Sequence, residues 1–242
     1  MLSTIQDAFR RRFDDGVNDH GPDVDRSDLT FEFDHSNRTR VTFDGRRYDC
    51  SWSASPDGQW RVAFGPDTQG QGCRVFGIRD GAIRYSVRIE RPTGCWIAND
   101  GTAIVVDGGR IGDTNSTAAF LTPDSGATSE STVSLSTNIG SAAISPDGRF
   151  GAFTSIGVRN VLHLYDLEAD DERAQHVLED GTGHFVSFDE SGGDCYLYDS
   201  RQDVLVYAVD VDGNRTWRHP QFTERVPAFT RTVNHIRTRI GF

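Results

Sequence analysis

A motif that recurs four times along the chain constrains the fold more than any other feature of the sequence. Each copy consists of a short apolar segment, a turn containing glycine, and a second apolar segment. The copies span residues 50–64, 94–108, 141–155 and 184–200. Their turn glycines are Gly58, Gly101, Gly148 and Gly192, which are 43, 47 and 44 residues apart. A fixed period of this size is typical of repeat proteins, in which each unit buries its apolar faces against its neighbours.

The residues that flank each turn share one phase. The positions four residues before the turn glycines are all apolar, and residues two apart lie on one face of a strand. Those positions are Ala54, Ile97, Ile144 and Phe188. A third apolar segment then ends in an acidic turn, at residues 73–81, 117–126, 161–171 and 204–213. A fourth segment follows at residues 82–90, 128–136, 174–180 and 214–220. Each unit is therefore predicted to hold four antiparallel strands.

Four-stranded units at a period of about 44 residues predict an all-β fold of the small β-propeller class. The predicted repeats cover about 50–93, 94–138, 139–182 and 183–220. An irregular β-sandwich is the alternative, but two series of turns that share one period favour the propeller.

The two ends of the chain contain further segments with the alternation of strands. These are residues 29–34, 38–45, 225–233 and 235–242. We favour a ring of five blades within residues 29–242, closed by N- and C-terminal strands that together form the fifth blade and remove free sheet edges. A four-bladed ring with an added hairpin, and an open stack that dimerises, are the alternatives.

Some of the repeats resemble those of known propellers. The segments SPDGQW (55–60) and SPDGRF (145–150) resemble the first hairpin of WD-repeat blades, and LYDL (164–167) resembles the end of a third strand. The segment 205–217 resembles the repeats of pyrroloquinoline-quinone-type propellers, and Trp217 occupies the position of their docking tryptophan. The resemblance implies a propeller fold over roughly residues 50–220. The Trp-Asp dipeptide and its paired Gly-His are absent as a set, so we infer no WD-family partner.

The segment before the first strand is predicted to be a short amphipathic helix followed by a linker. In residues 1–13, Leu2, Ile5, Phe9 and Phe13 form one apolar stripe at helical spacing. Residues 14–28 form an acidic linker, whose aspartates lack the spacing of a calcium loop. The helix also carries three arginines in a row. The candidate partner-binding residues are therefore Phe9, Arg10, Arg11, Arg12 and Phe13.

Composition limits the environment and the partners of the protein. All 25 basic residues are arginine, against 36 acidic residues, and the formal net charge is −11. This composition resembles that of proteins from salt-loving archaea, and we expect the fold to loosen in low salt, where acidic self-repulsion is least screened. The negative charge argues against nucleic acid as a partner. No apolar run is long enough to span a membrane, and Arg10–Arg12 precede an acidic segment rather than an export signal, so a cytoplasmic location is expected.

Residues that could perform chemistry do not form a recognisable motif. The four cysteines and seven histidines lack the spacings of zinc sites, and no nucleophile elbow or phosphate-binding loop occurs. We therefore assign no catalytic, cofactor-binding or metal-binding residue. A non-catalytic protein-interaction or scaffold module of a halophilic archaeon is the leading functional hypothesis. The alternatives are a ligand-binding or enzymatic propeller that uses its central channel, and a structural component of a virion or surface appendage.

Overall fold

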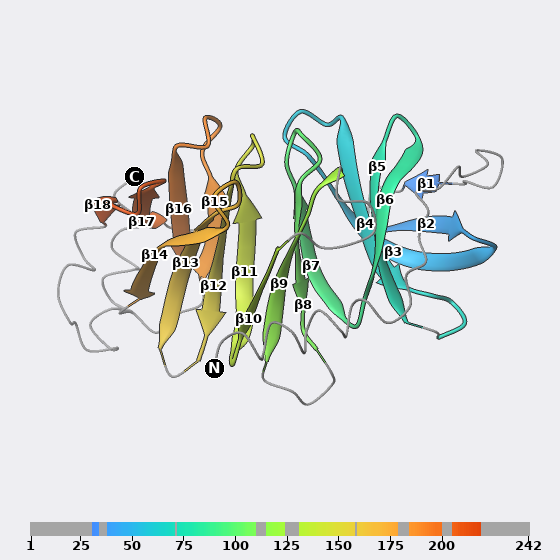
Figure 1. The fold of residues 1–242 in the computed structure, drawn as a ribbon, viewed down its shortest axis with the longest axis horizontal. Helices are drawn as coiled ribbons and strands as arrows, with labels where there is room; N and C mark the ends of the chain where they lie inside the picture. Colours follow the sequence, from blue (N-terminus) through green and yellow to red (C-terminus); the bar gives the residue numbers. More distant parts are fainter. Residues whose placement is uncertain are drawn as a thin grey trace, which may run out of the picture.

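The described part of the chain folds into eighteen β-strands in four antiparallel sheets (Figure 1). The computed structural model describes residues 31–33, 38–70, 72–109, 115–123, 131–157, 159–178, 184–199 and 205–218. The first sheet contains β1 (Phe31–Phe33), β2 (Arg38–Phe43), β3 (Arg46–Ala54), β4 (Trp60–Pro66), β5 (Cys73–Arg79) and β6 (Ala82–Ile89). The second contains β7 (Pro92–Ile97), β8 (Ala103–Asp107), β9 (Ser116–Leu121) and β10 (Ser131–Leu135). The third contains β11 (Asn138–Ile144), β12 (Phe150–Ile156), β13 (Asn160–Asp166) and β14 (Asp171–Leu178). The fourth contains β15 (His184–Phe188), β16 (Asp194–Asp199), β17 (Leu205–Asp210) and β18 (Arg215–Arg218).

Each of the four antiparallel sheets contains one of the predicted hairpins. The two arms of every predicted hairpin are the pairs β3–β4, β7–β8, β11–β12 and β15–β16. All four turn glycines have positive φ, from 72° at Gly58 to 96° at Gly101, a region that side chains with a Cβ rarely adopt. The third and fourth strands of each unit follow as a meander. The regular spacing of the glycines therefore reflects a backbone requirement that is the same in every unit.

The sheets stack face to face in one row, with the first sheet at one end and the fourth at the other (Figure 1). Neighbouring sheets meet mainly through the first two strands of each repeat, for example β11 against β15 and β4 against β7. Successive residues of a middle strand point to opposite neighbours, as in β8, where Val105 packs towards the first sheet and Ile104 towards the third. All five residues of β8 are buried because this strand is covered on both faces. This arrangement of stacked four-stranded sheets is propeller-like.

The N-terminal strands have a different place from the one that we expected. β1 and β2 belong to the first sheet and pair with β3, so in the described residues they do not form part of a separate fifth blade. Val41 of β2 and Tyr48 of β3 pack with Phe76 and Ile78 of β5, in a cluster drawn from the first sheet alone. The hairpin therefore closes the outer face of the first sheet, which no other sheet of the described residues covers.

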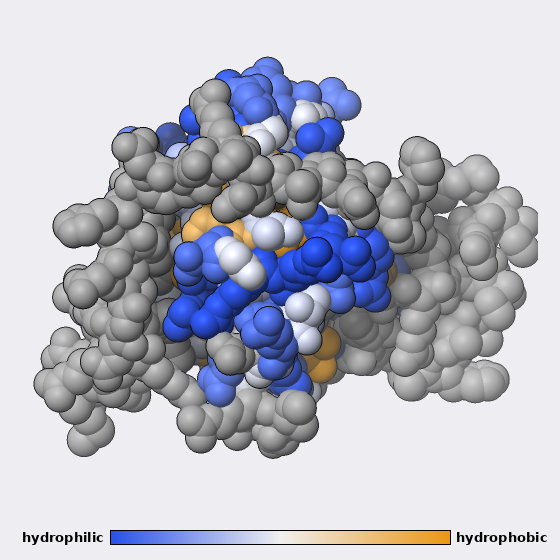
Figure 2. Space-filling model, turned by 90° about the vertical axis from the view of Figure 1, so that its right-hand side faces the viewer, coloured by the Kyte–Doolittle hydropathy of each residue, from blue (hydrophilic) through white to orange (hydrophobic). Residues whose placement is uncertain are grey.

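The outer side of this hairpin is polar, as a terminal cap requires. Along β2, the exposed residues Arg38 and Arg40 alternate with the buried residues Thr39 and Val41. Figure 2 views this end of the row and shows a largely hydrophilic surface on the described residues, with a smaller hydrophobic area. Repeat proteins need terminal units with a polar outer face, because an uncapped apolar face associates with other molecules.

Several expectations concern residues that the structure does not describe. The helix of residues 1–13, the acidic linker of residues 14–28 and the C-terminal strands of residues 225–242 all lie outside the described ranges. A closed ring of five blades therefore stays a prediction. Within the described ranges, no helix is long and apolar enough to cross a membrane.

Candidate functional site

The turn that joins the first two strands of each unit is held by its own polar side chains. In the first turn, the Ser55 hydroxyl donates to Asp57 Oδ1 at 2.6 Å and accepts the N–H of Trp60 at 3.0 Å. Asp57 accepts hydrogen bonds from the Ser55 hydroxyl and from the N–H of Gln59. Both lower the pKa of Asp57, and the Ser55 hydroxyl has the larger effect. The third turn has the same arrangement, in which the Ser145 hydroxyl donates to Asp147 Oδ1. The Ser-Pro-Asp-Gly sequence therefore encodes a rigid turn with an ionised carboxylate at its tip.

The second and fourth turns also hold an aspartate by hydrogen bonds, but with different partner residues. Asp100 accepts the N–H and the hydroxyl of Thr102 at 2.8 and 2.7 Å. Asp189 accepts the hydroxyl of Ser191 at 2.6 Å and the N–H of Asp194 at 3.0 Å. An aspartate is therefore fixed in the turn of every unit, although the four turn sequences differ.

The turns of neighbouring sheets also contact one another. The N–H of Asp57 donates to Asn99 Oδ1 at 2.9 Å, and the N–H of Asn99 donates to the carbonyl of Pro146 at 2.9 Å. Gly101 lies against the indole of Trp60, and Gly192 lies against Ser145 and Pro146. The four turns consequently form one continuous strip across the ends of the four sheets.

We call this end of the strands the turn face. It consists of the described residues 55–59, 80–81, 98–102, 145–149, 167–170, 189–193 and 211–214. These residues include nine acidic side chains and one arginine, Arg149. The described connections at the opposite end, residues 44–45, 67–70, 72, 90–91, 108–109, 115, 136–137, 157 and 159, carry three acidic residues and two arginines. The negative charge of the connections is therefore concentrated at one end of the strands.

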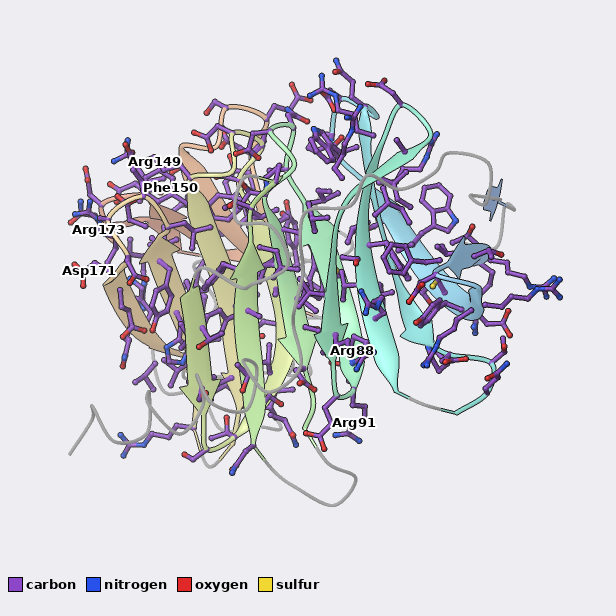
Figure 3. The ribbon with its side chains drawn as sticks, turned by 45° about the vertical axis from the view of Figure 1, so that its right-hand side comes forward. Arg88, Arg91, Arg149, Phe150, Asp171 and Arg173 are labelled. Carbon is purple, nitrogen blue, oxygen red and sulfur yellow. The ribbon has the colours of Figure 1, made fainter. Side chains whose placement is uncertain are left out.

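A buried aspartate of the third sheet binds two arginines next to the turn face. Asp166 is fully buried at the end of β13 and accepts hydrogen bonds from Arg173 at 2.6 Å and Arg149 at 3.2 Å. Figure 3 shows Arg149 and Arg173 together at this end, and Arg88 near the other end of the strands. Burial acts to raise the pKa of Asp166, but the two guanidinium groups and the N–H of Ala169 outweigh it and lower the pKa to about 2. Asp166 therefore holds two arginines of the turn region in place.

One set of side chains in the third sheet has the composition of a catalytic triad. His163 Nε2 lies 3.3 Å from Ser155 Oγ, and His163 Nδ1 lies 2.8 Å from Glu172 Oε1. An ionised carboxylate only accepts hydrogen bonds, so Nδ1 carries a proton and, in a neutral ring, Nε2 accepts from the serine. The second carboxylate oxygen of Glu172 accepts from Gln175 at 2.7 Å. The histidine ring also stacks on Phe153, with the ring centroids 4.9 Å apart.

The geometry of this set indicates a structural role. Ser155 is only 5% exposed and His163 only 7%, because both lie on the face of the third sheet that packs towards the second. A nucleophilic serine must reach a substrate carbonyl, beside hydrogen-bond donors that stabilise the developing oxyanion. The hydrogen bonds instead join the three strands β12, β13 and β14 in the interior.

We expect His163→Ala to lower the free energy of unfolding by about 2 kcal/mol, because it removes two hydrogen bonds and a stacked ring from a buried position. Glu172→Gln keeps an acceptor oxygen for Nδ1–H and should cost less than about 1 kcal/mol. Denaturation by urea at constant salt measures both values. Labelling of Ser155 by a fluorophosphonate probe, lost in His163→Ala, would contradict the structural role.

The binding site predicted in the N-terminal segment stays a prediction. Phe9, Arg10, Arg11, Arg12 and Phe13 lie outside the described residues. Trp217 is in β18, as the repeat predicted, and is 38% exposed. Among the described residues, the four cysteines are free thiols, and no group of three or more potential ligands is placed to hold a metal ion.

Comparisons with known proteins identify the fold only. No protein-family model matches this chain, and no curated protein matches it in sequence. The hydrazine synthase of Kuenenia stuttgartiensis is similar in structure with a TM-score of 0.50 and 17% identity, over 73% of this chain and 59% of that one. The Cps50 (Swd1) β-propeller domain of Myceliophteria thermophila has a TM-score of 0.45 and 11% identity, over 70% and 64% of the two chains. A eukaryotic initiation factor has a TM-score of 0.47 and 12% identity, over 79% and 55%. The chain therefore spans less than two thirds of each solved chain, and similarity at this level of identity concerns fold rather than activity.

Proposed function

We propose that this protein is a non-catalytic interaction module whose turn face binds a basic protein partner. The observation that carries the proposal is the unequal charge of the two ends of the strands. Five of the nine acidic residues of the turn face stand in turns that are held by hydrogen bonds within and between sheets, namely Asp57, Asp100, Asp147, Asp189 and Glu190. A rigid array of carboxylates loses little conformational entropy on binding, which favours recognition of a charged partner.

Arginine is the side chain in a partner that fits this surface best. Guanidinium forms two parallel hydrogen bonds to a carboxylate and is more weakly hydrated than an ammonium group. Such contacts depend on close geometry and not on long-range attraction, which molar salt screens within about 3 Å. We also propose a cytoplasmic, salt-rich setting, and a second contact through the predicted helix at Phe9–Phe13.

Affinity capture from a halophilic host at molar salt tests the proposal, with three full-length baits. The first is the unchanged protein. The second carries Asp80→Asn, Glu190→Gln and Asp212→Asn, which remove three exposed charges from the turn face. The third carries Asp44→Asn, Asp49→Asn and Glu90→Gln, which remove three exposed charges from elsewhere. The variants have the same net charge, so they separate the position of the charge from its amount.

We expect the first and third baits to retain one identified basic protein and the second to lose it, with at least about tenfold weaker binding. Equal capture by all three baits would contradict a role of the turn face. Deletion of residues 1–13 from the unchanged bait separately tests the predicted helix, since loss of the same partner is expected if the helix contributes.

The arginine-only, acidic composition leads to a prediction for stability. We expect the midpoint temperature of unfolding to rise steadily as KCl increases from about 0.2 M to about 3 M, because salt screens repulsion among the acidic side chains. Circular dichroism at each salt concentration measures the midpoint. A midpoint that is constant or falls over this range would show that the composition is not an adaptation to salt.

A further inference from the structure

The two ends of the row of sheets are finished differently. At the first sheet, the hairpin β1–β2 covers the outer face, and both Val41 of this hairpin and Phe76 of β5 beneath it are fully buried. At the fourth sheet, Val186 and Leu197 pack against the third sheet, so their neighbours on β15 and β16 point to the outer face. The outer face of the fourth sheet therefore needs a cover that the described residues do not supply.

Aromatic side chains make up much of this outer face. Phe185 pairs with Tyr198 across β15 and β16, while Tyr196 and Trp217 both pair with Ala208 of β17. Phe185 is 54% exposed and Trp217 is 38% exposed, and both tyrosines are half-buried. We call these four residues the aromatic face. An aromatic surface of this kind marks a contact site.

We propose that residues 219–242 of the same chain cover the aromatic face. This segment begins two residues after Trp217 and so starts at the edge of the fourth sheet. Its short tether gives it a high effective concentration at this face, well above that of a second molecule. Its two alternating stretches, residues 225–233 and 235–242, are long enough to cross strands of four to six residues.

The side chains of the segment match the surface in both polarity and charge. In residues 235–242, Ile236, Ile240 and Phe242 alternate with Arg237 and Arg239, so one side of a strand is apolar and the other is basic. The charged residues described in the fourth sheet and its turns are six acidic residues and two arginines, Arg215 and Arg218. Their acidic members are Asp189, Glu190, Asp194, Asp199, Asp210 and Asp212. The apolar side of the segment would lie on the aromatic rings and its arginines would point away from them, so the opposite net charges of segment and sheet would attract without direct ion pairs.

Photo-cross-linking in the full-length protein tests this cap. Phe185→p-benzoylphenylalanine places the photoreactive ring on the aromatic face, and mass spectrometry locates the cross-link. The matched control is Val177→p-benzoylphenylalanine, at a residue of β14 with 47% exposure. A further variant adds Ile240→Asp to the Phe185 probe, which puts a charge on the apolar side of the segment.

We expect the Phe185 probe to form an intramolecular link to residues 219–242, the Val177 probe to form none with that segment, and Ile240→Asp to abolish the link. A link between two molecules would assign the aromatic face to a second copy and overturn the proposal. A Phe185 probe that reacts only outside residues 219–242, or not at all, would overturn it as well. The cap does not depend on partner binding at the turn face, so each proposal stands or fails by its own experiment.

Discussion

Acidification should remove about 2 kcal/mol of stability that Asp166 contributes to the folded protein. The pKa of Asp166 is about 2 in the folded state, whereas an aspartate in an unfolded chain has a pKa near 3.9. A lowered pKa means that the stabilisation is complete above about pH 4 and is lost as the pH falls towards 2. The full difference corresponds to about 2.6 kcal/mol, and we reduce it because the side chains of Arg149 and Arg173 are 47% and 40% exposed.

The Asp166→Asn variant isolates this contribution. We expect it to be about 2 kcal/mol less stable than the unchanged protein at pH 6 and about equal to it near pH 2, when stability is measured by urea denaturation at constant salt. Asp80→Asn is the control, because Asp80 is 75% exposed and its variant should differ little at either pH. A stability difference for Asp166→Asn that is the same at pH 6 and pH 2 would show that loss of the charge is not the cause.

The repeated part of the fold was predictable because one local requirement recurs in it. A turn that needs positive φ selects glycine, and the flanking apolar alternation marks the two strands, so the hairpins of all four sheets could be located. The place of the N-terminal strands was missed although a local signal was present. Asp44 and Gly45 have φ of 50° and 67° and join β2 to β3 as a two-residue hairpin, so β2 extends the first sheet and does not begin a separate one.

The polar networks were less predictable than the strands. Ser155, His163 and Glu172 stand on three different strands at unequal sequence intervals, and a bulge between Leu164 and Tyr165 alters the register between β13 and β14. The contact between Ser155 and His163 could have been predicted once β12 was paired with β13, because Ser155 lies opposite Val161, two residues from His163. For Asp166, the period of the repeat indicated a turn, but not which arginines would reach its carboxylate.

The turn glycines combine two requirements that the sequence alone cannot separate. Each has positive φ, and three of the four also lie against residues of the preceding sheet. Gly58 is the exception, because it is in the first sheet and a Cβ at this position would meet no atom within 4 Å. A Cβ at Gly101 would lie 2.5 Å from the buried ring of Trp60. Conformational freedom therefore explains Gly58, whereas close packing between sheets contributes to the selection of Gly101.

Substitution of these two equivalent glycines should separate the two requirements. We expect Gly58→Ala to lower the free energy of unfolding by about 1 kcal/mol, which is the cost of placing a Cβ at positive φ. Gly101→Ala carries the same cost, and in addition the methyl group must displace Trp60, which is 3% exposed and packed in the core between the first two sheets. We expect a total loss of about 3 to 4 kcal/mol for this variant. Guanidinium denaturation of both variants in the same buffer gives the difference.

Gly45→Ala is a further control for the backbone term, since its φ of 67° also lies in the left-handed region and nothing lies within 4 Å of its added Cβ. Its cost should equal that of Gly58→Ala. If Gly101→Ala costs no more than these two, Trp60 moves freely and the turns do not lock the sheets together. If it costs about 2 kcal/mol more, the contact between turns holds the first two sheets in register, and the rigid strip of carboxylates on the turn face follows from that contact.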